Sequence, residues 1–361
     1  MVPSFPVEIK ISSFLNIPLK NHLGSIENLF LFDSGSSALS FVFGSKIFEN
    51  KKIGLPIYSC ASVYNSLIFS NREIVPLDIC VTNKGYEINL DDLQKCDVLL
   101  FIHFFGYIFT DFELIKKRYP ELIIIEDCSH CLITSYKKNK NIFGAIFSFN
   151  FHKPIVAGIG GAFVINDLDY KDYFHSYYKN IEIIQNNPFI MNKFLRIFLK
   201  NSFYYKPLYF LYFTLLKKNK TVNFNLFNSE ISIKRLNPKF INIINNQIEV
   251  SNNKCKLDNK YYLINELYRL PIQEFSYLCY FPLFIDNDLK RDALIKFFFN
   301  RKIDYFILWQ NAQVYTKYLG YLFDQYNFEK SYKMFKSILF IPELLFNDKE
   351  LVQELLYLLE E

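Results

Sequence analysis

Glycine, methionine and tryptophan are scarce in this chain. Among 361 residues there are 11 Gly, 3 Met and 1 Trp, against 40 Phe and 26 Tyr. Glycine at 11 of 361, about 3%, lies well below the usual level of about 7%. Phe, Tyr, Ile, Asn and Lys share A/T-rich codons, so base composition explains the bias. A glycine retained against that bias marks a position that only glycine fits.

A cysteine framework is also missing. The seven Cys are odd in number and match no disulfide scaffold. Cys128 and Cys131 form one C-x-x-C around His130, but no second Cys or His pair completes a zinc set, so we expect no metal site. Reduced thiols predict a cytoplasmic protein.

Long apolar runs and charge blocks are absent too. No apolar segment reaches the roughly 20 residues that span a bilayer, and residues 1–20 lack the pattern of a signal peptide. The net charge is 41 − 36 = +5 with the lysines spread along the chain, which gives no support to nucleic-acid binding. With 51% apolar residues, the composition is that of a folded globular protein.

Strand and helix patterns alternate in the N-terminal part, where ten of the eleven glycines lie. Strands are expected at 28–32, 52–57, 73–77, 98–103, 122–125, 146–149 and 162–165, and helices at 36–48, 61–69 and 112–118. This alternation predicts an α/β domain with a mostly parallel sheet. The clustered glycines place any ligand cradle in the same part of the chain.

The remaining half has a different pattern. We predict a large domain over residues 1–235, in which 185–230 is an aromatic and basic helical segment, and a smaller α+β domain over 236–361. Further helices are expected at 237–257, 289–299 and 348–359, and strands at 277–284 and 303–308. The segment 185–230 suits protein core or a subunit interface, and contact with a membrane surface is the alternative.

The strongest chemical motif runs from Ser148 to Gly161. A strand delivers Ser148, Lys153 follows five residues later, and a turn with three glycines in four residues leads into the next strand. Such a turn lets the backbone pass close to a bulky group. A lysine in this apolar, glycine-rich setting is a candidate for covalent catalysis rather than a solvated surface charge.

Two other segments complete a constellation. Asp127 ends a buried strand, at the sheet edge where open α/β folds bind ligands. Ser36 and Ser37 open a helix directly after a strand, where free backbone N–H groups can hold a phosphate. Pyridoxal phosphate requires such a cradle, a lysine that binds it covalently and a carboxylate that keeps its pyridine nitrogen protonated.

Four blocks in this order resemble the DegT/DnrJ/EryC1/StrS sugar aminotransferases, which have the aspartate-aminotransferase-like architecture called fold type I. They match the family's helix start, the segment over the cofactor ring, H-x-x-G with E-D-x-x-Q/H, and S-x-x-x-x-K-x-x-x-x-G-x-G-G. The blocks are Ser34–Leu39, Leu55–Ser62, His103–Gly106 with Glu126–His130, and Ser148–Gly161. Together they cover about residues 30 to 167.

The resemblance implies a role for each matching residue. Lys153 is the Schiff-base lysine and proton shuttle, Asp127 binds the pyridine nitrogen, and His130 stands near the phenolic oxygen. By the same resemblance, Ser36, Ser37 and Ser148 hold the phosphate. Either Tyr58 or Cys60 lies near the face of the cofactor ring.

The family also implies a reaction and an assembly. The expected reaction transfers an amino group, commonly from glutamate, to a nucleotide-linked keto-sugar, as in amino-sugar or cell-surface polysaccharide biosynthesis. Family members usually place the active site at the boundary of a homodimer, and Arg235 is our candidate for a residue that crosses over.

The chain departs from the family pattern at three places. Ile159 replaces a Glu, Cys60 stands where a ring-stacking aromatic is usual, and the N-Y-R motif reads Ile233-Lys234-Arg235. Three alternatives therefore stand beside a sugar aminotransferase. They are a dehydratase of the same fold, an aminotransferase for a non-sugar ketone, and a relative that has lost catalysis and serves in binding or regulation.

Overall fold

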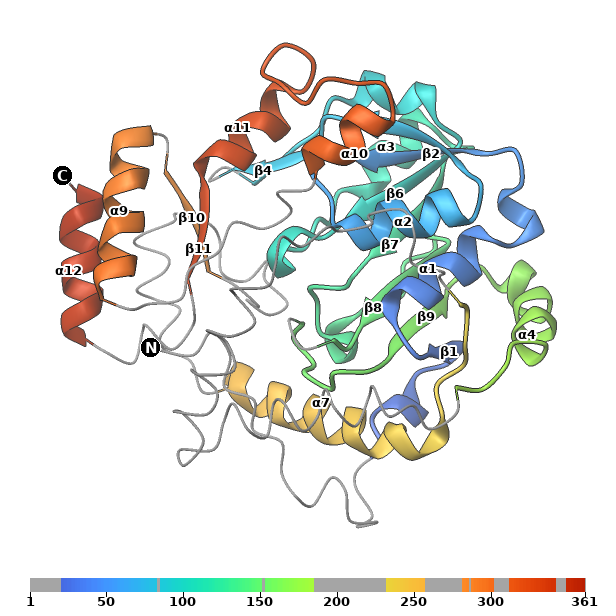
Figure 1. Cartoon of the computed structure of the whole chain (residues 1–361). Helices are drawn as coiled ribbons and strands as arrows, with labels where there is room; N and C mark the ends of the chain where they lie inside the picture. Colours follow the sequence, from blue (N-terminus) through green and yellow to red (C-terminus); the bar gives the residue numbers. More distant parts are fainter. Residues whose placement is uncertain are drawn as a thin grey trace, which may run out of the picture.

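A seven-stranded sheet forms the centre of the molecule (Figure 1). The computed structural model describes residues 21–82, 85–150, 153–184, 232–256, 281–285, 287–301, 312–341 and 349–360. The strands of the sheet are β1 (Leu29–Phe32), β2 (Lys52–Pro56), β3 (Glu73–Leu77), β6 (Val98–Ile102), β7 (Ile123–Asp127), β8 (Gly144–Ser148) and β9 (Gly161–Ile165).

The strand order is β1-β9-β8-β7-β6-β2-β3. All neighbouring pairs from β3 to β8 are parallel, whereas β9 runs antiparallel to both β8 and β1. β1 therefore runs in the same direction as β8, and the carboxyl ends of six strands meet at one edge. The predicted α/β class with a mostly parallel sheet is confirmed.

Helices cover both faces of this sheet. In the large unit they are α1 (Gly35–Phe43), α2 (Ala61–Phe69), α3 (Phe112–Arg118), α4 (Lys171–Lys179) and α7 (Ile241–Lys256). The helix expected over 36–48 ends earlier, at Phe43, and Lys46–Phe48 forms a separate 3-10 turn. Gly44 is the C-cap of α1, and glycine is required there because a Cβ would lie 2.5 Å from the Ser40 carbonyl oxygen.

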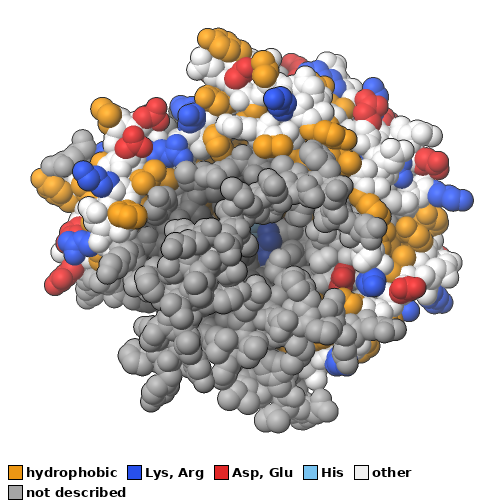
Figure 2. Space-filling view, in the orientation of Figure 1, with side chains coloured by type: hydrophobic (Ala, Val, Ile, Leu, Met, Phe, Trp, Pro, Cys, Tyr) orange, Lys and Arg blue, Asp and Glu red, His pale blue; other side chains and the backbone are white. Residues whose placement is uncertain are grey.

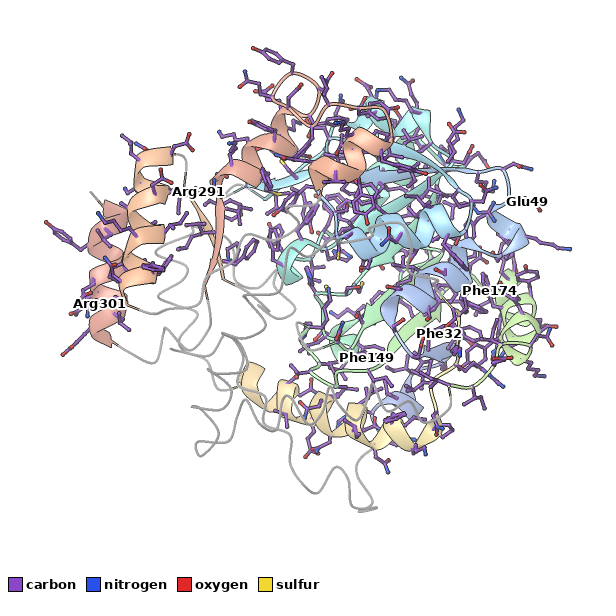
Figure 3. The ribbon with its side chains drawn as sticks, in the orientation of Figure 1. Phe32, Glu49, Phe149, Phe174, Arg291 and Arg301 are labelled. Carbon is purple, nitrogen blue, oxygen red and sulfur yellow. The ribbon has the colours of Figure 1, made fainter. Side chains whose placement is uncertain are left out.

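Alternate residues of the strands fill two separate cores. On the α1 side, Phe32 packs on Phe41 of α1 with ring centroids 4.8 Å apart, and Phe174 of α4 joins the same cluster. On the other side, Phe147 and Val164 pack with Ile244 of α7. Figure 3 shows Phe32 and Phe174 toward α1 and α4, and Phe149 toward α7. This period of two is what a sheet buried on both faces requires.

The helix α7 was expected in the C-terminal domain, but its apolar face belongs to the core of the large sheet. Ile243, Ile244 and Ile248 are buried there, and Ser251 donates a hydrogen bond to the Pro154 carbonyl at 2.7 Å. We therefore propose that the domain boundary lies after α7 instead of at 235/236.

The smaller unit packs helices beside a two-stranded antiparallel sheet (Figure 1). Its elements are β10 (Phe281–Phe284), β11 (Ile338–Ile341), α9 (Asp288–Asn300), α11 (Glu329–Ser337) and α12 (Lys349–Glu360). The helix α10 (Ala312–Tyr318) packs instead on α2, where the rings of Tyr315 and Tyr64 stack with centroids 4.8 Å apart. The Asp78 carboxylate, just after β3, accepts the backbone N–H groups of Lys330 and Ser331 at 3.1 and 2.8 Å. This distant cap fixes the start of α11 against the large sheet.

The sequence patterns did not predict five of the elements that the structure contains. They are β11, α10, α11 and the hairpin of β4 (Cys80–Thr82) and β5 (Gly85–Glu87). The segment 185–230 and the strand expected at 303–308 lie outside the described residues. Among the helices that are described, none has the length and apolar character needed to span a bilayer.

Candidate active site

The predicted site residues gather at the carboxyl edge of the sheet. Asp127 is the last residue of β7 and pairs in register with Ile146 of β8, two residues before Ser148. The turn into α1 reaches the same edge from β1, because Ser34 bridges to Gly160 and Gly160 donates its N–H to the Asp33 carbonyl at 2.8 Å. Parallel strands thus bring together residues more than 100 positions apart.

The start of α1 is the segment for which the sequence predicts a phosphate cradle. Ser34 caps the helix by accepting the Ser37 N–H at 3.1 Å, whereas Gly35 and Ser36 are first-turn residues whose N–H groups have no partner within the helix. Close packing holds this helix start against the neighbouring strands. A Cβ on Gly161 would lie 2.4 Å from the Gly35 nitrogen, and one on Gly35 would lie 2.9 Å from the Ser148 Cβ.

An acid that sequence reasoning missed lies beside this cradle. The Ser37 hydroxyl donates to the Asp33 carboxylate, and the Ser34 hydroxyl donates to it at 3.4 Å. Burial raises the pKa of Asp33, and these hydrogen bonds and Lys234 only partly offset the effect. The Ser37 hydroxyl is therefore engaged with Asp33. The groups left at this helix start for a phosphate are the Gly35 and Ser36 N–H groups, the Ser36 hydroxyl and Ser148.

Lys153 lies in the turn between β8 and β9. Its N–H bonds the Asn150 carbonyl at 3.2 Å, its side chain is half-buried, and Gly158 and Gly160 adopt the left-handed φ values of 71° and 106° that glycine permits. On the described part of the face seen in Figure 2, basic and acidic side chains are interspersed rather than gathered in one patch. The neighbouring His152 is outside the described residues.

Asp127 ends β7 and His130 lies in the turn that follows, and both are buried. The Asp127 carboxylate accepts the Ser129 N–H at 2.9 Å, which fixes its rotamer. Burial first, and then the charge of Lys153, lower the pKa of His130 well below its usual range. His130 is therefore a neutral imidazole within the electrostatic reach of the lysine.

The two candidates for the ring face differ in exposure. Tyr58 is fully buried between Phe104 and Phe335, with ring centroids 6.3 and 6.1 Å away, and burial raises the pKa of its hydroxyl far above the usual range. Cys60 is half-buried directly before α2, with its Sγ 3.1 Å from the Ser62 hydroxyl. Of the two, Cys60 has the exposure that contact with a ligand requires.

Beneath the site, the ligand atoms of His103, Glu126 and Cys128 lie within 4.8 Å of one another. His103 Nε2 lies 2.9 Å from Glu126 Oε1, and its Nδ1 accepts the Phe109 N–H at 3.2 Å. A metal bound at Nε2 would require a proton on Nδ1, where the Phe109 N–H already points. Metal-binding histidines donate from the second nitrogen instead. The cluster is therefore suited to a buried His–Glu pair rather than to a metal ion.

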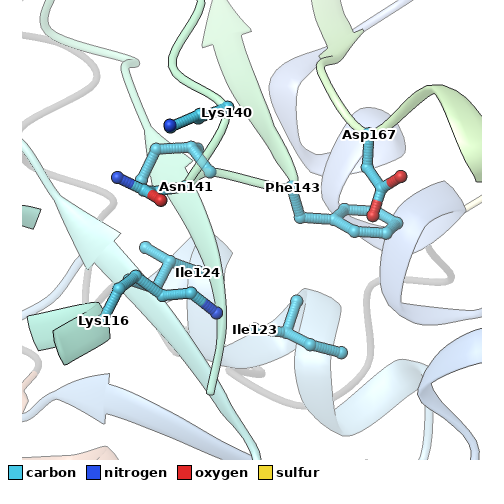
Figure 4. Close-up of a pocket in the computed structure, with 8 residues that line it drawn as sticks. Lys116, Ile123, Ile124, Lys140, Asn141, Phe143 and Asp167 are labelled. Atoms are coloured by element: carbon cyan, nitrogen blue, oxygen red, sulfur yellow. The ribbon is translucent and has the colours of Figure 1, made fainter. Parts of the chain in front are cut away.

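A separate small pocket lies at the opposite edge of the sheet (Figure 4). It measures about 100 Å³ and is lined by Lys116 of α3 and by residues at the start of β7, before β8 and after β9, among them Lys140 and Asp167. Lys116 donates its ammonium group to the carbonyls of Pro120 and Leu122. None of the residues proposed for catalysis lines this pocket.

The donor set at the carboxyl edge fits pyridoxal phosphate. A helix N-terminus with hydroxyls suits the phosphate, a buried carboxylate suits a protonated pyridine nitrogen, and a lysine supplies the amine. The backbone approach at Gly35 and Gly161 leaves no room for side chains there, which is why the cradle is built from glycine and serine.

Comparison with known proteins agrees with this geometry. The model of the DegT/DnrJ/EryC1/StrS aminotransferase family matches residues 22–180. PseC of Helicobacter pylori, an aminotransferase involved in the biosynthesis of pseudoaminic acid, is 17% identical, with a TM-score of 0.64 and coverage of 99% of this chain and 96% of that one.

Two further solved structures are similar in fold. The putative sugar aminotransferase Spr1654 of Streptococcus pneumoniae, in its PLP form, is 12% identical, with a TM-score of 0.65 and coverage of 92% and 87% of the two chains. NtdA of Bacillus subtilis with bound PMP is 18% identical, with a TM-score of 0.60 and coverage of 92% and 73%. No curated protein sequence matches the chain.

The fold and the family model together identify a pyridoxal-phosphate-dependent aminotransferase of fold type I. Within that class, residues 22–180 match the DegT/DnrJ/EryC1/StrS aminotransferase family. The resemblance inferred from the four sequence blocks is thereby confirmed.

Proposed function

We propose that the enzyme transfers an amino group from an amino acid, glutamate in the first instance, to a keto-sugar linked to a nucleotide. The observation that carries the proposal is the meeting of Lys153, Asp127 and the α1 cradle at one sheet edge. The sugar substrate is supported by the names of similar proteins, because PseC acts in pseudoaminic acid biosynthesis and Spr1654 is a putative sugar aminotransferase. The product would serve amino-sugar or cell-surface polysaccharide biosynthesis.

Each residue has a proposed task. When bound, pyridoxal phosphate supplies an electron sink that stabilises negative charge on the substrate carbon. Lys153 would hold the cofactor and move a proton between two carbons, and Asp127 would keep the pyridine nitrogen protonated through its negative charge. His130 would donate a hydrogen bond to the phenolic oxygen. Ser36 and Ser148 would bind the phosphate, and Cys60 would face the ring.

The reaction is tested in two halves. Protein loaded with pyridoxal phosphate should be yellow, and added glutamate should convert the bound cofactor to the colourless amine form. A nucleotide-linked keto-sugar should then restore the yellow form and gain an amino group that mass spectrometry detects. The control is the same keto-sugar without its nucleotide, which we expect to react at least tenfold more slowly because it lacks the remote binding energy. Equal rates with a simple non-sugar ketone would favour the alternative aminotransferase.

We also propose a homodimer that completes each site with residues of both chains. Apolar side chains are exposed on and after α10: Tyr318, Leu322 and Tyr326 are 56%, 67% and 86% exposed. Arg235 is a poor candidate for a residue that reaches into the active site of the partner subunit, because its guanidinium lies 5.4 Å from the centre of the Tyr178 ring of its own chain. The main chain of Arg235 also bridges to Phe32 of its own chain.

Light scattering without detergent should give twice the chain mass of 43.0 kDa. A stable dimer interface hides apolar area of the kind exposed after α10. A monodisperse monomer with full activity would contradict the proposal, and binding of that monomer to anionic vesicles would instead support the membrane alternative.

A further inference from the structure

The turn after β6 contains an aromatic residue in a conformation that aromatic residues avoid. Phe105 has φ 60° and ψ 10°, in the left-handed region. The other three non-glycine residues with positive φ in the described parts of the chain are asparagines, which tolerate this conformation. For a residue with a Cβ the left-handed form is disfavoured about five- to thirtyfold. Surrounding contacts must therefore impose it on Phe105.

This conformation directs a backbone donor to an active-site histidine. The Phe105 N–H donates to His130 Nδ1 at 3.2 Å. A nitrogen that accepts a hydrogen bond carries no proton, so the proton of neutral His130 resides on Nε2. The two rings lie nearly parallel, 20° apart in plane and 6.3 Å between centroids.

The same turn also directs a backbone N–H group to a second buried histidine, His103. Phe109 donates its N–H to His103 Nδ1 at 3.2 Å, and His103 Nε2 bonds Glu126 at 2.9 Å. Burial lowers the pKa of His103, but the bond to Glu126 and the nearby negative groups outweigh burial, so the net direction is upward. The Phe109 N–H nevertheless opposes a second proton at Nδ1. One turn thus holds two buried imidazoles with their protons on Nε2.

The side chain of Phe105 supplies the packing that imposes its backbone conformation. It is 1% exposed and lies 4.7 Å from the Phe340 ring of β11 and 5.8 Å from Phe104. The Tyr86 hydroxyl accepts the Phe104 N–H at 2.7 Å and donates to the carbonyl of Ile102 or Tyr107. The turn is therefore anchored on both sides of Phe105.

We propose that Phe105 is a positioning residue whose left-handed backbone fixes His130 as the neutral Nε2–H tautomer that the cofactor site uses as a hydrogen-bond donor. The identity of the acceptor, the phenolic oxygen of pyridoxal phosphate, rests on the proposed function. The tautomer itself rests only on the contacts of the protein. Phe105 acts through His130 and touches no reacting atom.

Two variants separate the backbone of Phe105 from its ring. Phe105→Gly and Phe105→Ala both remove the ring and leave the same cavity, but only alanine has a Cβ that disfavours the left-handed form. In nitrogen-15 spectra of cofactor-free protein at pH 7, wild type and Phe105→Gly should show a protonated Nε2 and an unprotonated Nδ1 for His130. The His130→Gln variant assigns the signals, since the chain has five histidines.

In the alanine variant, the equilibrium population of this Nε2-protonated state relative to other states should be about five- to thirtyfold lower than in the glycine variant. The dissociation constant for pyridoxal phosphate should rise by the same factor, because only the correctly oriented fraction binds. A wild-type His130 protonated on Nδ1, or equal spectra and equal affinities in the two variants, would overturn the inference. If wild type binds no pyridoxal phosphate at all, the proposed function fails, whereas the wild-type spectrum still decides the tautomer.

Discussion

Replacement of Lys153 by alanine should abolish the visible absorption of the bound cofactor and lower turnover by at least about 10⁴-fold, the upper range for a single acid–base group. The variant removes both the covalent attachment and the group that moves the proton. Because the Lys153 side chain is only half-buried, its removal should leave no large cavity in the core. The midpoint temperature of thermal unfolding should therefore stay near that of wild type. Absorbance, steady-state turnover and thermal unfolding measure the three effects.

The control for this variant is another lysine of the same domain. Lys140 is exposed and lines the pocket at the opposite edge of the sheet (Figure 4), so Lys140→Ala should keep both colour and rate. Persistence of the absorption band and of turnover in Lys153→Ala would remove the lysine from the mechanism.

Replacement of Asp127 by asparagine should retain cofactor binding in part but lower turnover about 10²- to 10³-fold, the usual cost of one preorganised electrostatic partner. The amide oxygen can still accept the Ser129 N–H that the carboxylate accepts at 2.9 Å, so the local turn should survive. The negative charge that stabilises a protonated pyridine is lost. Stopped-flow measurement of each half-reaction would separate this effect from weaker substrate binding.

Asp167 offers a matched control for the Asp127 variant. The Asp167 carboxylate accepts the N–H of Asp169, two residues ahead, at 3.1 Å. Asp127 makes the same kind of bond with Ser129, but Asp167 lies at the other edge of the sheet. Asp167→Asn should leave the rate near wild type. A comparable loss in both variants would indicate a general destabilisation and would argue against a special role for Asp127.

The sequence predicts the local elements of the large domain well. The expected helices at 61–69 and 112–118 and the strand at 73–77 have the bounds found in the structure. These segments have strong periodicity and clear turn signals at their ends. The order of the sheet, with β9 between β1 and β8, is a non-local property that hydrophobic periodicity cannot determine.

The site shows the same division between local and non-local information. The motif spacing predicts that Lys153, Asp127 and Ser148 lie at one edge, because parallel strands end together. The Ser37 hydroxyl has two possible acceptors, the Asp33 carboxylate close by in the sequence and the Ser232 carbonyl, which follows almost 200 residues later. The left-handed Phe105 has no local signal except Gly106, since its conformation is imposed by tertiary packing against Phe340.

The placement of α7 depended on an interaction across the chain. Its apolar positions predict a helix from sequence alone, and a helix is found at Ile241–Lys256. The face that it covers is set by side chains of β8 and β9, more than 75 residues earlier, such as Phe147 and Val164. For this reason we propose a domain boundary after this helix, whereas the pattern changes along the chain predict one before it.

Reduction of the cofactor-loaded protein with borohydride, followed by peptide mass mapping, tests the central claim most directly. Reduction makes the link between cofactor and lysine permanent, so the modified residue can be located. We predict one pyridoxyl phosphate group per chain, on Lys153. Attachment to any other lysine, or no attachment to protein incubated with excess pyridoxal phosphate, would contradict the account.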